Sequence, residues 1–96
     1  MKKLENPKWE ECREHLKTRI LPALLEILRD FFGNEKIYFD ISTQRNGEFI
    51  TVYAAVSDVH GITTDYVSLH LSYYDSIEDI DRDYNKLAEF IKKHLA

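Results

Sequence analysis

Apolar side chains recur at three- and four-residue steps over the first third of the chain, which predicts one long helix. Asn6 can cap the free amides of its first turn, and Pro7 suits the first helical position. Gly33 suits the left-handed residue that ends a helix. Pro22 lies inside the pattern and removes one backbone hydrogen bond, so we expect a kink or a break near residues 19–21. The apolar face comprises Trp9, Cys12, Leu16, Ile20, Ala23, Leu24, Ile27 and Phe31.

A second apolar stripe runs along the same helix, rotated from the first. It consists of Leu21, Leu25, Leu28 and Phe32, at a 4-3-4 spacing. A helix that is apolar on two sides is either covered by another helix or pairs with another chain. Packing beneath the second helix of this chain is the simpler account. The alternative is that the second stripe is the surface of a homodimer.

Three segments then alternate apolar and polar side chains, which predicts three β-strands. They span residues 36–42, 48–57 and 65–74. The apolar positions of each segment face a common core, and the positions between them face away. The outward-facing set is rich in aromatic residues and comprises Tyr38, Asp40, Ser42, Phe49, Thr51, Tyr53, Tyr66, Ser68, His70, Ser72 and Tyr74.

Asn46-Gly47 joins the first two strands and is a strong signal for a two-residue hairpin turn, because both residues tolerate positive φ. A turn at these two residues places Ile41 opposite Val52. The apolar side chains of both strands then lie on one side of the hairpin. Turn chemistry and hydrophobic pattern therefore predict the same register independently.

The second hairpin has two interpretations. Gly61-Ile62 can form a two-residue turn with glycine first, and a longer loop between residues 57 and 64 is the alternative. With the short turn, Asp40, Tyr53 and His70 lie in one row across the three strands. A flat sheet has no cleft to hold a substrate, so this row is a poor candidate for an enzyme site.

The last segment of the chain predicts a second amphipathic helix, which completes the order α-β-β-β-α. Its stripe comprises Ile77, Ile80, Tyr84, Leu87, Ala88, Ile91 and Leu95. We expect an α+β fold, a two-layer sandwich in which a three-stranded antiparallel meander carries two helices packed on one face. The 96 residues form a single domain, residues 1–96.

This order of elements resembles that of the double-stranded RNA-binding domain. Domains of that family hold phosphates through lysines at the start of their last helix. The equivalent segment here reads "SIEDIDRD", residues 76–83, in which the sign of the charge is reversed. The resemblance covers the topology and no motif, so we do not predict RNA binding.

The stretch "DSIEDIDRDYNKLAEF", residues 75–90, is the most acidic part of the chain. Asp79-x-Asp81-x-Asp83 looks like the start of a calcium loop, but Tyr84 stands at its sixth position, where glycine is needed, and Phe90 at its twelfth, where a bidentate glutamate is needed. A capped helix start explains the carboxylates better, because acidic groups are favourable at a helix N-terminus. Asp75, Asp79 and Asp83 remain candidates for an acidic surface that meets a basic partner.

Composition narrows the function classes. The formal charge of −4 argues against a general affinity for nucleic acid or anionic membranes. No apolar run is long enough to span a bilayer, and the start "MKKLENPKWEE" does not look like a secretory signal. The single cysteine, Cys12, fits a reducing compartment and lies on the apolar stripe, where an inert core thiol is expected. We expect a cytoplasmic protein with no cofactor and no metal site.

These observations favour a non-catalytic regulatory or adaptor domain that binds a protein partner, with homodimerisation as an option. Tyrosine is typical of interfaces because it contributes a large area with a polar tip. The predicted partner-binding residues are Tyr38, Asp40, Phe49, Tyr53, Tyr66, His70 and Tyr74. The alternative is an acidic inhibitor that mimics nucleic acid and blocks a nucleic-acid-handling enzyme of the phage or mobile-element type.

Overall fold

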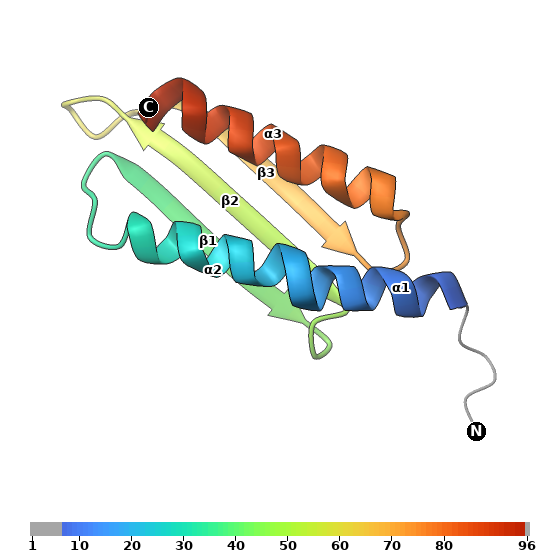
Figure 1. Cartoon of the computed structure of the whole chain (residues 1–96). Coiled ribbons are helices and arrows are strands. Elements are labelled where there is room, and N and C mark those ends of the chain that lie inside the picture. Colours follow the sequence, from blue (N-terminus) through green and yellow to red (C-terminus); the bar gives the residue numbers. More distant parts are fainter. Residues whose placement is uncertain (1–6, 96) are drawn as a thin grey trace.

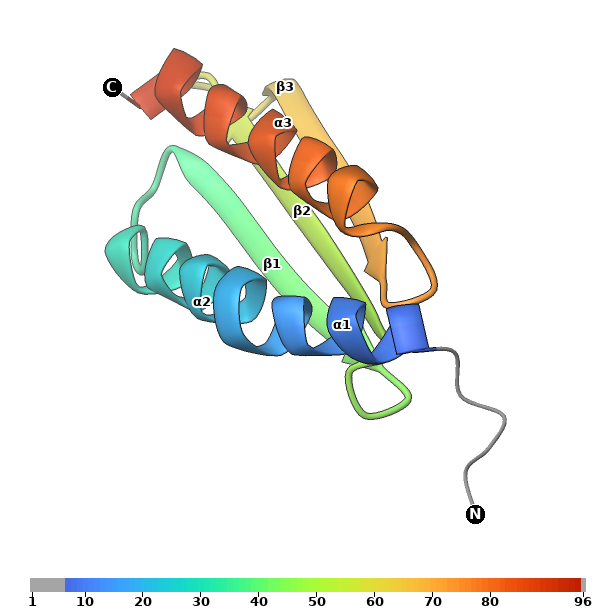
Figure 2. The same cartoon turned by 45° about the vertical axis from the view of Figure 1, so that its right-hand side comes forward.

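The computed structural model describes residues 7–95 and has the predicted order of elements. The first helix runs without interruption through α1 (Pro7–His15), a π-helical turn (Leu16–Ile20) and α2 (Leu21–Asp30). The remaining elements are β1 (Ile37–Gln44), β2 (Phe49–Ser57), β3 (Thr63–Ser72) and α3 (Ile77–Leu95). The strands form an antiparallel meander, and both helices cover the same face of it (Figure 1, Figure 2). The predicted two-layer α+β sandwich is confirmed.

The predicted register of the first hairpin is confirmed, because Ile41 lies opposite Val52 and Ile37 opposite Val56. The turn differs from the prediction. The strand ladder already ends at the pair Gln44 and Phe49, so four residues connect the strands instead of two. Arg45, Asn46 and Gly47 all have positive φ, of 55°, 59° and 91°. The left-handed stretch therefore starts one residue earlier than Asn46-Gly47 alone indicates.

Gly47 in this turn gives a direct test of backbone strain. An added Cβ would meet no atom within 4 Å, so the φ of 91° is the only obstacle to a side chain there. We expect Gly47→Ala to lower the free energy of unfolding by about 1–2 kcal/mol in urea denaturation. Gly47→Asn should cost less, because asparagine tolerates left-handed backbone better. An alanine variant as stable as the parent would contradict this account.

The second hairpin adopts the longer of the two predicted connections. The Asp58 side chain holds its loop by accepting hydrogen bonds from the backbone N–H groups of His60 at 2.8 Å and Ile62 at 3.0 Å. An irregularity follows, since Val56 pairs with Asp65 whereas Ser57 pairs with Thr63. The extra residue on β3 forms a bulge and sets the register of the whole strand.

The first helix continues past Pro22, but its α-helical hydrogen bonding is interrupted by the π-helical turn Leu16–Ile20, which includes part of residues 19–21, where we expected a kink or a break. The N–H of Leu21 bonds the carbonyl of Leu16, five residues back, and so forms a wider π turn just before the proline. The same turn explains the four-residue spacing of the core positions. In a regular α-helix, each residue is rotated by about 40° around the helix axis relative to the residue four positions before it. The extra residue of the π turn returns Ile20 and Leu24 to the face that carries Leu16.

The core lies between the helices and the sheet. From the helices it contains Cys12, Leu16, Ile20, Leu24, Ile80, Leu87 and Phe90, and from the sheet Ile37, Ile50, Val52, Ala54, Val56, Leu69 and Leu71. The predicted stripe of α3 needs one correction. Ala88 is exposed, whereas Phe90 is buried, because Phe90 lies one helical step of three residues after the buried Leu87. The cap predicted at Asn6 and the side chain of Leu95 lie outside what the structure describes.

Candidate functional site

Three tyrosines form a continuous row of rings on the open face, the sheet face opposite the helices. We name Tyr38 of β1, Tyr53 of β2 and Tyr66 of β3 the tyrosine ladder. The ring centroid of Tyr53 lies 6.0 Å from that of Tyr38 and 5.9 Å from that of Tyr66. These separations are typical of favourable aromatic pairs. The alternation within each strand turns all three rings to the same face, and the registers of the two hairpins place them side by side. The rings are up to 28 residues apart in sequence.

Ala55 explains why the ladder forms at this point of the sheet. It is the β2 residue that pairs with both Tyr38 and Tyr66, so a small side chain sits between two large ones. The Tyr53 ring lies next to this gap and contacts both neighbouring rings. As a result Ala55 is only 3% exposed although it lies on the open face. The sequence contained this signal, an alanine among aromatics, but its meaning depends on the register of both hairpins.

The outer rings of the ladder remain open to solvent. Tyr38 is 60% exposed and Tyr66 is 61% exposed, whereas the central Tyr53 is half-buried. Large aromatic side chains with this exposure form an apolar area that bears hydroxyl groups. The predicted location of Tyr38, Tyr53 and Tyr66 on one exposed face is therefore what the structure has.

Asp40 lies beside the ladder as the direct cross-strand partner of Tyr53. Directly opposed residues on one sheet face have Cβ atoms about 4.5–5.5 Å apart. Asp40 is exposed, and its carboxylate makes no hydrogen bond or ion pair with another described residue. A free carboxylate is thus placed next to the central ring of the ladder.

His70 does not share the row of Asp40 and Tyr53, which corrects the prediction made with the short Gly61-Ile62 turn. Tyr53 pairs with Ser68, and His70 pairs with Thr51, one step along the sheet. The Thr51 hydroxyl and the His70 Nδ1 are 3.5 Å apart. The physical reason is the longer loop and the bulge, which displace β3 by two residues from the register of a two-residue turn.

Phe49 and Tyr74 belong to a second aromatic cluster at the end of the sheet. The Tyr74 ring lies 5.9 Å from Phe49, 4.8 Å from Trp9 of α1 and 4.6 Å from Tyr73. Its hydroxyl donates to Glu48 at 2.9 Å. The Tyr73 side chain, and after it the Glu48 carboxylate, raise the pKa of Tyr74 above its usual range. This second cluster ties α1 to the sheet, a role that the sequence reasoning missed.

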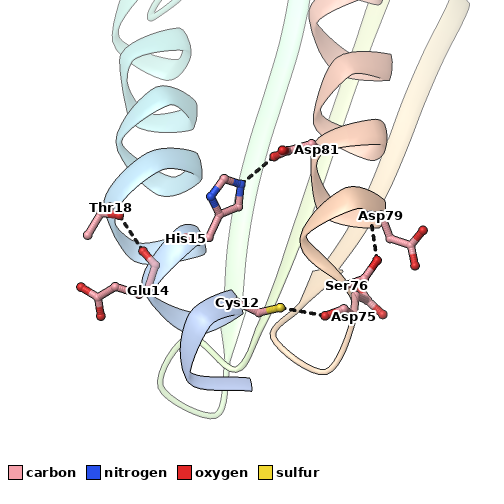
Figure 3. Close-up of polar contacts among 8 residues, drawn as sticks. All are labelled: Cys12, Glu14, His15, Thr18, Asp75, Ser76, Asp79 and Asp81. Atoms are coloured by element: carbon pink, nitrogen blue, oxygen red, sulfur yellow. Dashed lines mark hydrogen bonds and ion pairs between the residues drawn. The ribbon is translucent and has the colours of Figure 1, made fainter. Parts of the chain in front are cut away.

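Two of the acidic residues at the start of α3 are paired with cations on the same helix. Asp79 pairs with Arg82 at 2.7 Å, and Asp83 pairs with Lys86 at 3.5 Å. The backbone N–H of Asp79 donates to the Ser76 hydroxyl at 3.1 Å, which is the predicted helix cap (Figure 3). The backbone carbonyl of Asp75 accepts a hydrogen bond from the Cys12 thiol at 2.9 Å. These contacts are those of a capped, charge-balanced helix start.

The second stripe is not covered by α3, so the simpler account of it is wrong. Leu25 is 49% exposed and Phe32 is 86% exposed, whereas Leu21 and Leu28 are half-buried. The two helices are closest where α1 meets the start of α3, and they diverge toward their C-terminal ends (Figure 1, Figure 2). Within the described residues 7–95, Leu25 and Phe32 of the second stripe therefore remain exposed apolar side chains.

The orientation of α1 explains this exposure. His15 precedes the core residue Leu16 and reaches Asp81 of α3, with 2.6 Å between His15 Nε2 and Asp81 Oδ1 (Figure 3). The helix side that carries the residue before a core position thus faces α3 at His15. Leu25 follows the core residue Leu24, so its side chain is turned away from α3. The pattern of apolar and polar positions does not identify His15 as a contact between the helices.

His94 makes a second link of the same kind, to β3. Its Nε2 lies 2.8 Å from Asp65 Oδ2, and Lys93 Nζ lies 3.6 Å from the same oxygen. The other Asp65 oxygen accepts a hydrogen bond from the N–H of Tyr66 at 2.9 Å. The hydrogen bond with His94, and next the backbone bond from Tyr66, hold the pKa of Asp65 below its ordinary value. These contacts connect the end of α3 to the strand that carries Tyr66.

The depressed pKa of Asp65 gives a pH dependence with a definite sign. A carboxyl group whose folded-state pKa is lowered stabilises the fold fully above its unfolded value, about 3.9, and loses this contribution as the pH falls through the folded value. In an NMR titration of its carboxyl carbon, we expect Asp65 to titrate below pH 3.9 and His94→Ala to move the midpoint upward. His70→Ala should leave it unchanged. An unmoved midpoint in His94→Ala would argue against this link.

Within residues 7–95, no group of three or more His, Cys, Asp or Glu side chains is placed to hold a metal ion. No described helix is both long and apolar enough to cross a membrane. Neither family models, nor curated proteins, nor solved structures match this chain. The features of the molecule that bear on its function are the tyrosine ladder, the second stripe and the acidic helix start.

Proposed function

We propose that this chain is a non-catalytic adaptor or regulatory domain that docks a protein partner on the tyrosine ladder. The observation that carries the proposal is the exposure of two of its three rings on a sheet face that no described element covers. Tyrosine is enriched at interface cores because its ring buries a large area and loses little conformational freedom. A single buried thiol suits a reducing compartment, so we place the protein in the cytoplasm.

Packing supports the ladder as a preformed surface. The ring contacts on both sides of Tyr53 restrain the side chains before any partner arrives. An interface whose side chains are already ordered loses less entropy on binding. The Tyr53 and Tyr66 rings are stacked at 29° to each other, whereas the Tyr38 ring meets Tyr53 edge-on at 63°, so a partner would meet both ring faces and ring edges.

The competing acidic-inhibitor proposal has less support. A nucleic-acid mimic needs carboxylates that are free to replace phosphates, but Asp79 and Asp83 are each paired with a cation on the same helix. Exposed pairs of this kind reduce the local negative potential even where they add little stability. Charge reversal at both positions should therefore leave partner binding largely intact.

The docking proposal is tested by capture from an extract of the native host with the immobilised full chain. The test variant combines Tyr38→Ser with Tyr66→Ser, because both rings are exposed and their loss should leave the core unchanged. The matched control is Val59→Ser with Ile62→Ser, which removes two exposed apolar side chains from the loop between β2 and β3 and leaves both proposed interfaces unchanged. A partner held by the parent and the control, and lost from the test variant, supports the proposal. Equal retention by all three chains refutes it.

A homodimer through the second stripe is a separate proposal, supported by the exposed Leu25 and Phe32 side chains. Phe32→Ser should change the free energy of unfolding by no more than about 0.5 kcal/mol, because the ring is nearly free of packing. Light scattering after size exclusion measures the mass of the parent and the variant. A dimer that dissociates in Phe32→Ser supports the stripe as its interface, and a parent that stays monomeric at high concentration excludes it.

A further inference from the structure

The open face has an unbalanced charge that indicates what kind of side chain it would receive. Among its strand residues, Asp40 is the one carboxylate, and none is lysine or arginine. Most of the others are hydroxyl-bearing or aromatic. The face therefore offers hydrogen-bond acceptors, ring faces and one negative charge to a partner, and it offers no fixed positive charge.

This arrangement disfavours nucleic acid and favours a cation. Aromatic rings on a sheet can stack bases, but such sites also need lysine or arginine to neutralise phosphates. A cation, by contrast, is attracted to the face of a tyrosine ring and to a carboxylate at the same time. Asp40 and Tyr53 are direct cross-strand neighbours, so one positive group can reach both.

We propose that the tyrosine ladder and Asp40 together receive an arginine side chain of the protein partner. The planar guanidinium would stack on the exposed ring of Tyr38, which lies two residues before Asp40 on the same face of β1, and would donate two hydrogen bonds to the Asp40 carboxylate. Both interactions suit arginine better than lysine, because the ammonium group of lysine is compact and strongly hydrated and cannot form the same flat, two-pronged contact. The inference rests on the proposed function and adds the chemistry of the partner.

The molecule itself contains a contact of this type. In the second aromatic cluster, the guanidinium carbon of Arg13 lies 4.8 Å from the ring centroid of Tyr73. That pair is made within the chain, between α1 and the segment after β3. The tyrosine ladder has the equivalent rings and a free carboxylate, but no cation from any described residue lies over it. An arginine from a partner would supply what Arg13 supplies at the second cluster.

The inference is tested with the isotope-labelled full chain and short blocked peptides as probes. Acetyl-Arg-Gly-Arg-Gly-Arg-amide is compared with the same peptides containing lysine or glutamate, by chemical-shift titration at neutral pH. We expect shifts at Tyr38, Tyr53 and Tyr66 and an affinity for the arginine peptide about three- to tenfold above that for the lysine peptide. The glutamate peptide should not bind.

Two variants locate the site. Asp40→Asn keeps the size of the side chain and should lower the affinity for the arginine peptide about five- to tenfold. The matched control, Asp79→Asn with Asp83→Asn, removes more negative charge from α3 and should change the affinity less than twofold. Equal binding of the lysine and arginine peptides, or a larger effect of the α3 variant than of Asp40→Asn, would overturn the inference.

The capture experiment separates this inference from the docking proposal. If Tyr38→Ser with Tyr66→Ser loses the partner and Asp40→Asn keeps it at full affinity, the partner docks on the ladder without an arginine, and only the present inference fails. If both variants keep the partner, the docking proposal fails as well. Loss of the partner from both variants, with the α3 control unaffected, supports the two together.

Discussion

Leu24→Ala will lower the free energy of unfolding by about 3 kcal/mol, whereas Leu25→Ala will lower it by less than about 1 kcal/mol. Leu24 is fully buried among side chains of the helices and the sheet, so its truncation removes transfer free energy and leaves a cavity. Leu25 is 49% exposed, and its neighbours close over little of it. Urea denaturation of the two variants measures the difference.

The two substitutions form a matched pair, because they remove the same atoms from adjacent positions of one helix. Differences in helix propensity cancel between them. A domain of this size has a total stability on the order of 5 kcal/mol, so the Leu24 variant should be partly unfolded at physiological temperature. Equal losses of unfolding free energy in the two variants would mean that Leu25 is buried in solution. The homodimer through the second stripe would explain such burial.

Cys12 will react with a thiol reagent roughly a thousandfold more slowly in the folded chain than in urea. The side chain is 3% exposed and donates a hydrogen bond to the carbonyl of Asp75. Burial, and after it the carboxylates of Glu11, Asp75 and Glu78, raise the pKa of the Cys12 thiol, so little reactive thiolate forms. Labelling therefore requires the fold to open transiently. Such opening is rare when the free energy of unfolding is several kcal/mol.

The control places the thiol on the surface of the same helix. Thr18 is exposed in the π turn, so Thr18→Cys in a Cys12→Ala background should be labelled at nearly the rate of the unfolded chain. The rate in the parent should rise in Leu24→Ala by the same factor as the population of the open state. Fast labelling of Cys12 in the folded parent would contradict its place in the core.

The sequence predicted the first hairpin well because two local signals agree there. The Asn46-Gly47 dipeptide and the alternation of the strands lead to the same register, and a shift by one residue would turn every apolar side chain of β1 to solvent. The exact length of the turn was not predictable in the same way. Arg45 adopts a left-handed conformation that its residue type disfavours, so local preference gave no sign of it.

In the second hairpin, local signals do not determine the register. Glycine at position 61 suits several turns, and the alternation of β3 is equally satisfied by registers that differ by two residues. The loop held by the Asp58 side chain and the bulge after Val56 decide between them. The consequence for the candidate site is large, because His70 leaves the row of Asp40 and Ser68 takes its place beside Tyr53.

Contacts between distant elements could not be predicted from the sequence. His15 with Asp81 and His94 with Asp65 join residues from different elements, and nothing in the local pattern distinguishes them from solvated side chains. The uncovered second stripe belongs to the same class, because periodicity shows that a helix has two apolar sides without showing which side another helix will cover.

The sequence by itself determined the α-β-β-β-α order, the two-layer sandwich and the tyrosine-bearing outer face. These follow from the periods of 3.6 and 2.0 and from turn chemistry, which are properties of neighbouring residues. Only the tertiary structure decided that the rings of Tyr38, Tyr53 and Tyr66 close over Ala55 beside a free Asp40, because that depends on two registers and a bulge acting together. It also decided that Leu25 and Phe32 stay exposed, because that depends on how two helices diverge over one sheet.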